Sequence, residues 1–241
     1  MAEPARFSFV VPCYNEEPNL RPLLEAFSAR MDRKDLELIL VDNGSTDGTA
    51  RELARLLPLY PFARSVRVEI NRGYGAGILS GLAAAAGEYA GWIHADLQFS
   101  PAAAFEAAGL AERSGGEKLF IKGLRRGRPF TDRLFTGAMA LFESLLFGGR
   151  LRDVNGQPTL FHRSLLGTWA SPPLDFTLDL YASVTAVRAG FRVARFEVEN
   201  APRRRGASSW NRGLASRLRL AAATAVSSLR LRAALPRRPS A

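Results

Sequence analysis

The sequence has little cysteine, little lysine and, over residues 203–241, no negative charge. Cys13 is its one cysteine, which excludes an internal disulfide and is typical of a protein in a reducing compartment. It contains no run of 18 apolar residues, so we expect no membrane-spanning helix. The first twelve residues, MAEPARFSFVVP, lack a basic stretch followed by an apolar run, so we expect no signal peptide. These absences predict a cytoplasmic protein.

Positive charge is concentrated towards the C-terminus. The formal net charge is +10, and residues 203–241 contain ten arginines and no Asp or Glu. Such a basic segment suits an anionic partner, namely a phosphate, a membrane surface or a nucleic acid. The alternative is a solvated segment in a protein that uses arginine in place of lysine, since only three of its 33 basic residues are lysines.

Apolar runs of strand length alternate with helical patterns in the first half of the chain. The predicted strands are 6–12, 36–41, 65–70, 89–93 and 118–123. Later segments predict helices over 131–147 and 176–190 and a strand over 191–199. The alternation predicts an α/β fold with a mostly parallel sheet flanked by helices on both faces. We expect one domain over 1–212, followed by an Arg-rich helix and tail over 213–241.

Polar clusters follow four of the predicted strands. They are Asn15-Glu16, Asp42-Asn43, Asn71-Arg72-Gly73 and His94-Ala95-Asp96. In an open parallel sheet the carboxyl ends of the strands share one edge, and ligands bind outside that edge. Four clusters at one edge therefore predict a binding site there.

The stretch HADLQ, residues 94–98, places an imidazole, a carboxylate and an amide two residues apart. In an extended chain these three side chains point to the same side, and all three can bind a metal ion. A divalent cation held there would balance the charge of a nucleotide's phosphates. The alternative is a polar loop that simply leaves the sheet.

Glycines at 73, 75 and 77 open the helix that follows the third strand. Glycine lets the backbone approach a ligand closely, and a helix N-terminus favours anions, so Gly73 is a candidate nucleotide-binding residue. Because the glycines do not follow the first strand, we do not expect an NAD site.

Four successive stretches resemble the motifs of the inverting GT-A glycosyltransferases of family 2, in particular the dolichyl- and polyprenyl-phosphate mannose or glucose synthases. They are VVPCYNEEPNL, LVDNGSTDGT, NRGYGAGILSGL and HADLQFSP. The likeness is strong over residues 7–100 and continues more loosely through DVNGQPTLFHRS and RRRGASSWN. It implies a GT-A fold and a metal-dependent transfer of a sugar from a UDP- or GDP-sugar to a polyprenyl phosphate or another acceptor.

The resemblance also implies roles for the matching residues. Those that would bind the nucleotide-sugar are Pro12, Tyr14, Glu16, Asp42, Asn43, Arg204, Arg205 and Ser208. Those that match the D-x-D-x-Q site for Mn²⁺ or Mg²⁺ are His94, Asp96 and Gln98. Asp96 and Asp153 would serve catalysis, and Arg128, in a basic loop beside the expected site, is a candidate for the acceptor phosphate.

Position 94 departs from the family pattern, because His stands where the best-known members have Asp. A neutral imidazole removes one negative charge and suits softer divalent ions better than Mg²⁺. We therefore expect a site that tolerates or prefers Mn²⁺. In the alternative, His94 only hydrogen-bonds a loop carbonyl and Asp96 alone holds the metal.

The expected reaction is a single displacement at the anomeric carbon of the sugar. A phosphate acceptor is already ionised at neutral pH, so Asp153 would mainly position it. A hydroxyl acceptor needs a base, for which Asp153 is the first candidate. The alternative is that Asp153 fixes the turn that follows it.

The predicted helix over 213–235 carries arginines among Leu and Ala, and its apolar run is too short to span a bilayer. It can lie on an anionic membrane surface or pack against the domain. In the preceding predicted helix, we expect Phe135, Phe142 and Phe147 to belong to the core.

Two other functions stay open. A non-catalytic nucleotide-sugar-binding protein is favoured by the His at position 94. A nucleic-acid binder, which we do not expect, would rely on the basic tail.

Overall fold

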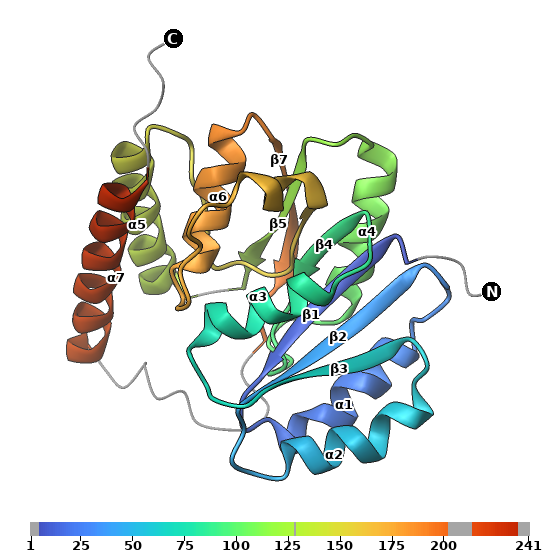
Figure 1. Ribbon diagram of the computed structural model, residues 1–241. Coiled ribbons are helices and arrows are strands. Elements are labelled where there is room, and N and C mark those ends of the chain that lie inside the picture. Colours follow the sequence, from blue (N-terminus) through green and yellow to red (C-terminus); the bar gives the residue numbers. More distant parts are fainter. Residues whose placement is uncertain (1–4, 128, 202–213, 236–241) are drawn as a thin grey trace.

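A seven-stranded sheet forms the centre of the computed structural model, which describes residues 5–127, 129–201 and 214–235 (Figure 1). The strand order is β3-β2-β1-β4-β6-β5-β7. The strands are β1 (Phe7–Cys13), β2 (Leu36–Asn43), β3 (Ala63–Val68), β4 (Tyr89–Trp92), β5 (Leu119–Arg126), β6 (Thr159–His162) and β7 (Arg192–Glu199). Only β6 runs against the others, pairing antiparallel with β4 and β5. The mostly parallel sheet predicted from the sequence is confirmed.

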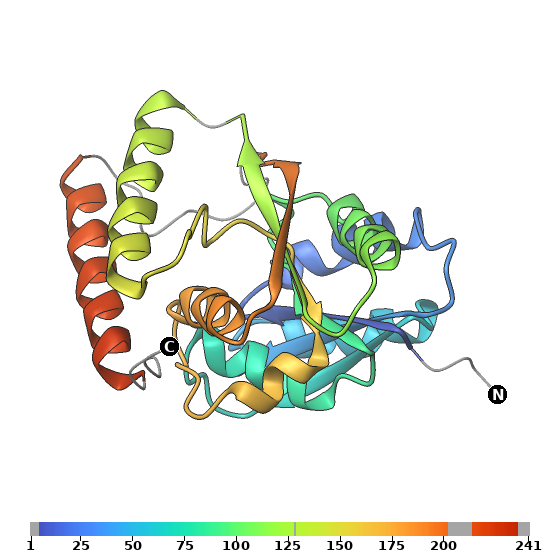
Figure 2. The ribbon, with the colours of Figure 1, turned by 90° about the horizontal axis from the view of Figure 1, so that it is seen from above.

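Helices cover both faces of this sheet, as the turned view in Figure 2 shows. One face packs against α1 (Glu17–Ser28), α2 (Thr49–Leu56) and α4 (Ala102–Ser114). The other packs against α3 (Tyr74–Ala84), the 3-10 helix η2 (Arg163–Thr168) and α6 (Leu178–Arg188). A short 3-10 turn, η1 (Leu57–Leu59), follows α2.

Strand β1 illustrates why the sequence forms this three-layer arrangement. Its side chains alternate between the two faces, so Phe7 and Phe9 join the apolar cluster under α1 while Val10 joins the cluster under α3. All three are fully buried, which a strand at the centre of an α/β sheet requires. The register pairs Cys13 with Asp42, so β1 and β2 end at nearly the same level of the sheet.

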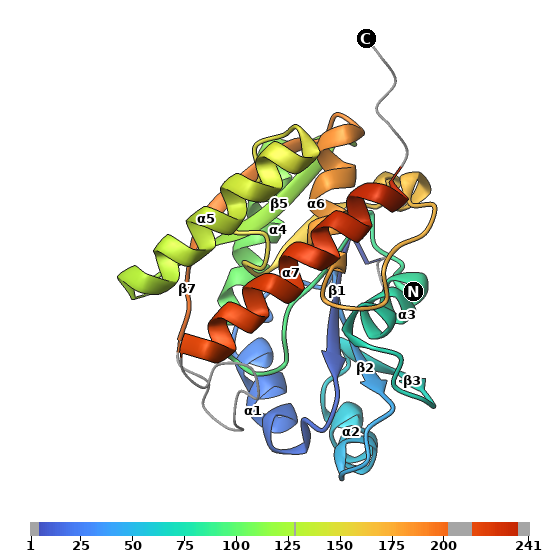
Figure 3. The same cartoon turned by 90° about the vertical axis from the view of Figure 1, so that its left-hand side faces the viewer.

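The last two long helices, α5 (Phe130–Phe147) and α7 (Leu214–Ala234), lie side by side at one end of the molecule (Figure 3). The Arg232 Nε donates to the Leu146 carbonyl oxygen at 3.2 Å, and the Ser228 hydroxyl donates to Glu143 at 3.3 Å. The predicted C-terminal helix is therefore present, and its described part packs against α5. The proposed domain boundary at residue 212 stays a prediction, since residues 202–213 lie outside the described part of the chain.

Phe147 is buried, as expected, while Phe135 and Phe142 are half-buried. Among the described helices, none combines the length and the hydropathy needed to cross a membrane.

Candidate functional site

The loops after β1 and β2 are hydrogen-bonded to each other at the carboxyl edge of the sheet. The Thr46 backbone amide donates to the Asn15 Oδ1 at 2.8 Å, and the Asn15 amide donates to the Ser45 hydroxyl at 3.1 Å. The Glu16 amide donates to the Thr49 hydroxyl at 2.9 Å. Two of the four polar clusters seen in the sequence therefore form one local structure.

Two carboxylates that the resemblance assigns to the nucleotide lie at the carboxyl edge of the sheet, Asp42 at the end of β2 and Glu16 in the loop after β1. Asp42 is buried, and its Oδ1 accepts from the Ser45 amide at 3.0 Å. Glu16 accepts from the Asn19 side chain at 2.5 Å. Burial raises the pKa of the Cys13 thiol, and the charges of Glu16 and Asp42 raise it further. Cys13 is buried, so it is a protonated, unreactive structural thiol.

Two neighbouring candidates for the nucleoside are more accessible. Tyr14 is 48% exposed, and Pro12 is half-buried beside it. An aromatic ring that is half exposed at the carboxyl edge of the sheet offers a stacking surface for a base.

The structure gives Asn43 and Gly73 partners within the chain. The Asn43 Nδ2 donates to the Gly73 carbonyl oxygen at 3.0 Å. Gly73 has φ +111°, and a Cβ built there would lie 2.4 Å from the carbonyl oxygen of Leu174. The close backbone approach expected at Gly73 is therefore an approach to Leu174. This contact fixes the start of α3, where the Ala76 amide donates to the same carbonyl oxygen at 3.1 Å.

The HADLQ stretch is a turn and not an extended strand. Strand β4 ends at Trp92, residues 95 and 96 form a turn, and Leu97 has a φ of +56°. The alternation on which we based the convergence of His94, Asp96 and Gln98 is therefore wrong. The Gln98 backbone amide donates to the Asp96 Oδ1 at 3.2 Å. The Nε2 of the Gln98 side chain donates to the Ala201 carbonyl oxygen at 3.5 Å.

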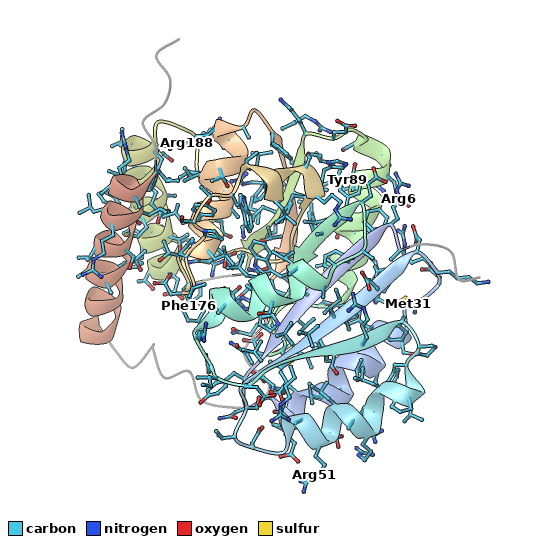
Figure 4. All side chains as sticks on the ribbon, viewed as in Figure 1. Arg6, Met31, Arg51, Tyr89, Phe176 and Arg188 are labelled. Atoms are coloured by element: carbon cyan, nitrogen blue, oxygen red, sulfur yellow. The ribbon has the colours of Figure 1, made fainter. Side chains whose placement is uncertain are left out.

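His94 is held by aromatic neighbours. Its Nε2 lies 2.8 Å from the Tyr74 hydroxyl, and its ring meets the rings of Tyr74 and Phe99 edge to face. Phe176, labelled beside α3 in Figure 4, stacks on the other side of Tyr74 at a centroid distance of 4.5 Å. The imidazole is thus fixed by a side chain from the helix that follows Gly73.

The Tyr74 hydroxyl connects His94 to a buried carboxylate. Burial raises the pKa of Tyr74 well above its usual value, and the nearby Asp179 carboxylate raises it further, so the hydroxyl keeps its proton. An ionised carboxylate can only accept. We therefore assign the Tyr74 hydroxyl as the donor to Asp179. The same hydroxyl then accepts from the Nε2–H of His94, which leaves Nδ1 as the unprotonated nitrogen of that ring.

Asp179 is also the centre of a buried ion pair. The Lys122 Nζ lies 2.7 Å from the Asp179 Oδ1 and donates to the Thr159 hydroxyl at 2.6 Å. Gln157 donates to the same Oδ1 at 3.1 Å. Burial lowers the pKa of Lys122, and the charge of Asp179 opposes that shift. Lys122 and Asp179 are almost completely buried, so each depends on the other for charge balance.

Asp153 is buried and is bound by Arg125. The Arg125 backbone amide donates to one oxygen of the carboxylate at 2.7 Å, and the guanidinium Nε donates to the other at 2.8 Å. Asp153 has φ +43°, and its carbonyl oxygen accepts from the Gly156 amide at 2.9 Å. Its carboxylate therefore holds the end of β5 through Arg125.

Four candidates, namely Arg128, Arg204, Arg205 and Ser208, lie outside the residues that the structure describes. Within the described ranges, no group of three His, Cys, Asp or Glu side chains is arranged to hold a metal ion. The donors that remain are the buried Asp96 carboxylate and the His94 imidazole. This set fits a divalent ion that takes its other ligands from diphosphate oxygens and water, as Mg²⁺ sites on nucleotides do, and the nitrogen donor favours Mn²⁺.

A cavity of about 510 Å³ lies apart from this site, between the end of β3 and α3. Its wall includes Val68, Ile70, Leu79 and Leu174 and contains none of the predicted site residues. The polar groups described above therefore define the candidate site, and the cavity does not.

Sequence reasoning missed Tyr74, Lys122, Gln157 and Asp179. A lysine inside the apolar run KLFIKG and an aspartate inside the apolar helix segment FTLDLY were the available signals. Charges within apolar segments need buried partners of opposite sign, but the pairing of residues 122 and 179 comes only from the fold.

Comparisons with known proteins agree with this geometry. The sequence profile of Glycosyl transferase family 2 matches residues 8–128, about half of the chain. An undecaprenyl-phosphate 4-deoxy-4-formamido-L-arabinose transferase of Aeromonas hydrophila is 40% identical over 98 residues, which cover 39% of this chain and 30% of that protein. The dolichol-phosphate mannosyltransferase of Saccharomyces cerevisiae is 35% identical over 98 residues, covering 39% of this chain and 37% of that protein. The similarity thus spans about a third of each of these relatives.

A similar fold has been solved experimentally. Glucosyl-3-phosphoglycerate synthase from Mycobacterium tuberculosis, crystallised with Mn²⁺, UDP and glucosyl-3-phosphoglycerate, superposes with a TM-score of 0.70. It is 22% identical, and the superposition covers 97% of this chain and 81% of that one. At this identity the likeness shows the fold, which is the fold expected from the four motifs. Together with the profile match over half of its length, this places the chain in glycosyl transferase family 2.

Proposed function

We propose that this protein is a metal-dependent, inverting glycosyltransferase that moves a sugar from a UDP- or GDP-sugar to a polyprenyl phosphate. The observation that carries the proposal is the hydrogen-bonded structure of the loops after β1 and β2 at the carboxyl edge of the sheet, which holds Glu16 and Asp42 there in a chain of this family. Relatives that match 39% of the chain are named as an undecaprenyl-phosphate 4-deoxy-4-formamido-L-arabinose transferase and a dolichol-phosphate mannosyltransferase.

On the donor side, Asp42 and Glu16 would accept hydrogen bonds from the base and ribose, while Tyr14 would stack on the base. Asn43 and Gly73 would act indirectly, by fixing the start of α3 next to the donor. Arg204, Arg205 and Ser208 are proposed to contact the phosphates. The N–H groups of a base and the hydroxyls of a ribose are donors, which is why acidic side chains suit them.

Asp96 would hold a Mn²⁺ or Mg²⁺ ion, with the Nδ1 of His94 as a second ligand and Gln98 fixing the turn. When bound, the ion stabilises the charge that develops on the leaving diphosphate. The Tyr74 hydroxyl would set the tautomer of His94 by accepting a hydrogen bond from its Nε2–H, the kind of support that metal-binding histidines usually receive.

On the acceptor side, an ionised phosphate oxygen attacks the anomeric carbon, the bond to the diphosphate oxygen breaks, and the configuration inverts. The attacking oxygen carries no proton, so no base is required. Asp153 is therefore proposed as a positioning residue, which orients Arg125 by binding both its backbone and its guanidinium. Arg128 is proposed to meet the acceptor phosphate together with it.

A small phosphorylated acid is the second class of acceptor. The similarly folded protein of M. tuberculosis has been crystallised with phosphoglyceric acid. Such an acceptor would offer a phosphate, as a polyprenyl phosphate does. A polyprenyl phosphate would place the protein on the inner face of the membrane, whereas a phosphorylated acid would leave it in the cytoplasm. A nucleotide-sugar-binding protein without turnover is the remaining alternative, because His94 weakens the charge of the metal site.

Calorimetric titration of UDP and of GDP, each with Mn²⁺ and with a chelator, tests the donor site. We expect one of the two nucleotides to bind in the presence of Mn²⁺ and to lose most of its affinity when the metal is removed. Failure of both nucleotides to bind with Mn²⁺ present would contradict the proposal. Metal-dependent binding without any transfer would identify the non-catalytic alternative.

A further inference from the structure

Helix α5 carries a stripe of large apolar side chains that face solvent. Phe130 is 75% exposed, Leu134 65%, Leu141 63% and Leu145 77%. These positions repeat with helical spacing, so they lie on one side of the helix and form a strip about 22 Å long. We call these four residues the α5 stripe.

The stripe lies on the side of α5 that faces away from the rest of the protein. Glu143 and Phe147, which are buried against α7 and the core, lie on the opposite side of the helix. Four leucine- and phenylalanine-sized groups left in water on one helix are unusual, because burial of each would stabilise the protein. Such a surface is typical of a docking site.

Arginines bracket the stripe at both ends. Residues 125–152 contain six arginines and two acidic residues, of which Glu143 is buried. Arg133 is exposed near the start of α5, and Arg150 and Arg152 are exposed just beyond its end. The ten arginines of residues 203–241 add further positive charge to the same chain.

We propose that the α5 stripe docks on the surface of an anionic lipid bilayer. An apolar strip next to arginines is the composition of helices that lie in the membrane interface, with the apolar side chains among the acyl chains and the guanidinium groups at the phosphates. The sequence suggested membrane contact through the C-terminal helix alone. The structure adds α5 as the main apolar element.

Charge distinguishes a bilayer from a second copy of this chain. Two copies that paired their stripes in parallel would bring Arg133 next to Arg133. If they paired antiparallel, Arg133 of one copy would approach Arg150 and Arg152 of the other. Both arrangements place like charges together at the rim of the interface, which disfavours association, whereas anionic lipid headgroups would complement every one of these arginines.

This surface stands on its own observations, and only its use in catalysis rests on the proposed function. The stripe begins at Phe130, five residues after Arg125, which is bound to Asp153. A protein docked through the stripe would therefore hold the end of β5, which carries Arg125 and Arg126, close to the headgroups. A lipid-linked phosphate acceptor would then reach the site without leaving the bilayer.

Co-sedimentation of the full chain with vesicles tests the surface without any substrate. The vesicles contain phosphatidylcholine alone or phosphatidylcholine with phosphatidylglycerol. We expect binding to the anionic vesicles that weakens as salt rises. The double substitution Leu141→Glu with Leu145→Glu should lower binding at least tenfold. The matched control, Leu59→Glu with Ile70→Glu, changes exposed apolar residues elsewhere and should bind like the wild type.

Three outcomes would overturn the proposal. They are no binding to anionic vesicles, equal binding to neutral and anionic vesicles, and equal binding of the stripe variant and the wild type. Sedimentation velocity without lipid tests whether a second copy of the chain covers the stripe. A dimer that forms in the wild type and is lost in the stripe variant would assign the stripe to that second copy. Nucleotide binding by the stripe variant should remain unchanged. If the wild type itself bound no nucleotide, that result would count against the proposed function and not against the α5 stripe as a docking surface.

Discussion

In the half of the sheet built by β1, β2 and β4, the strands are mostly apolar, and the carboxylates of Asp42 and Glu16 lie at the carboxyl edge. In the half built by β5, β6 and β7, Lys122 and Asp179 are buried between the sheet and α6, while α5 exposes large apolar side chains. The first half resembles an ordinary α/β domain. The second half departs from this pattern, because it buries an ion pair and exposes a row of large apolar side chains.

This difference shows where each half acts. Loops that follow apolar strands can present carboxylates to a ligand at little cost to the core. A buried ion pair contributes little net stability but leaves a strongly destabilised charge if one partner is lost, so it fixes the two elements that carry it. Here the pair fixes β5 against α6. The Tyr74 hydroxyl, which interacts with Asp179, also contacts His94 and so connects the pair to the candidate metal site. The exposed face of α5 is left for a partner outside the chain.

The largest effect should follow Lys122→Met, which removes one partner of the buried pair. Asp179 would then be a buried carboxylate without its cation, and we expect the free energy of unfolding to fall by about 3–5 kcal/mol. Urea denaturation measures this value. Arg21→Met, which breaks an exposed pair with Glu25, should leave stability unchanged, and the comparison of the two halves fails if both variants behave alike.

Asp96→Asn tests the half of the sheet that carries the candidate site, because it should weaken binding and leave the fold intact. We expect the Mn²⁺-dependent affinity for the nucleotide to fall about 100-fold, since a neutral amide is a poor ligand for a divalent ion. Calorimetry in the presence of Mn²⁺ measures the loss. The exposed Glu69→Gln provides the control. Wild-type affinity in Asp96→Asn would remove this residue from the metal site.

Stability should depend on pH through Glu143, which is buried between α5 and α7. Burial raises its pKa to about 7, above its value in the unfolded chain, so the unfolded state releases this proton first. Stability from this group is therefore present below about pH 4.5 and is lost as pH rises towards 7. Glu143→Gln should add about 3 kcal/mol at pH 8 and almost nothing at pH 4.

Thermal melting between pH 4 and pH 8 tests this prediction, since the melting temperatures of Glu143→Gln and the wild type should diverge as pH rises. Ser228→Ala is the matched variant, because the Ser228 hydroxyl lowers the pKa of Glu143 by donating to it. Its removal should steepen the loss of stability. Parallel melting profiles for Glu143→Gln and the wild type would show that the carboxylate is solvated.

The smallest effect is expected from Tyr74→Phe, which removes the hydroxyl that joins the two halves through His94. Without it the imidazole loses the group that sets its tautomer, and Mn²⁺ affinity should fall about tenfold. Electron paramagnetic resonance of Mn²⁺ measures free and bound ion directly. Tyr60→Phe serves as the control. Unchanged affinity in Tyr74→Phe would favour the alternative in which Asp96 alone holds the metal.

Strand positions and the residues of the carboxyl edge could be predicted because both depend on local patterns. Alternation of apolar runs with helical spacing predicted the sheet, and β3 begins two residues earlier than expected, at Ala63–Val68 in place of 65–70. Asp42 and Glu16 lie at the ends of two strands that finish at nearly the same level, so their place at the carboxyl edge followed from the order of the elements.

The remaining features depend on contacts between distant residues. Gly73 meets Leu174, Tyr74 meets His94, and Lys122 meets Asp179, and no local pattern encodes these pairs. The geometry of the HADLQ stretch failed for a different reason. The left-handed conformation of Leu97 turns the chain, and nothing in the residue type announces it.

Transfer of sugar from a panel of UDP- and GDP-hexoses to undecaprenyl phosphate, with Mn²⁺ and with the Asp96→Asn variant in parallel, tests the central claim most directly. The account predicts a glycosyl phosphate lipid from one donor, formed only with the metal and reduced at least 100-fold in the variant. Transfer by the wild type that persists with a chelator, or an absence of transfer from every donor, would contradict it.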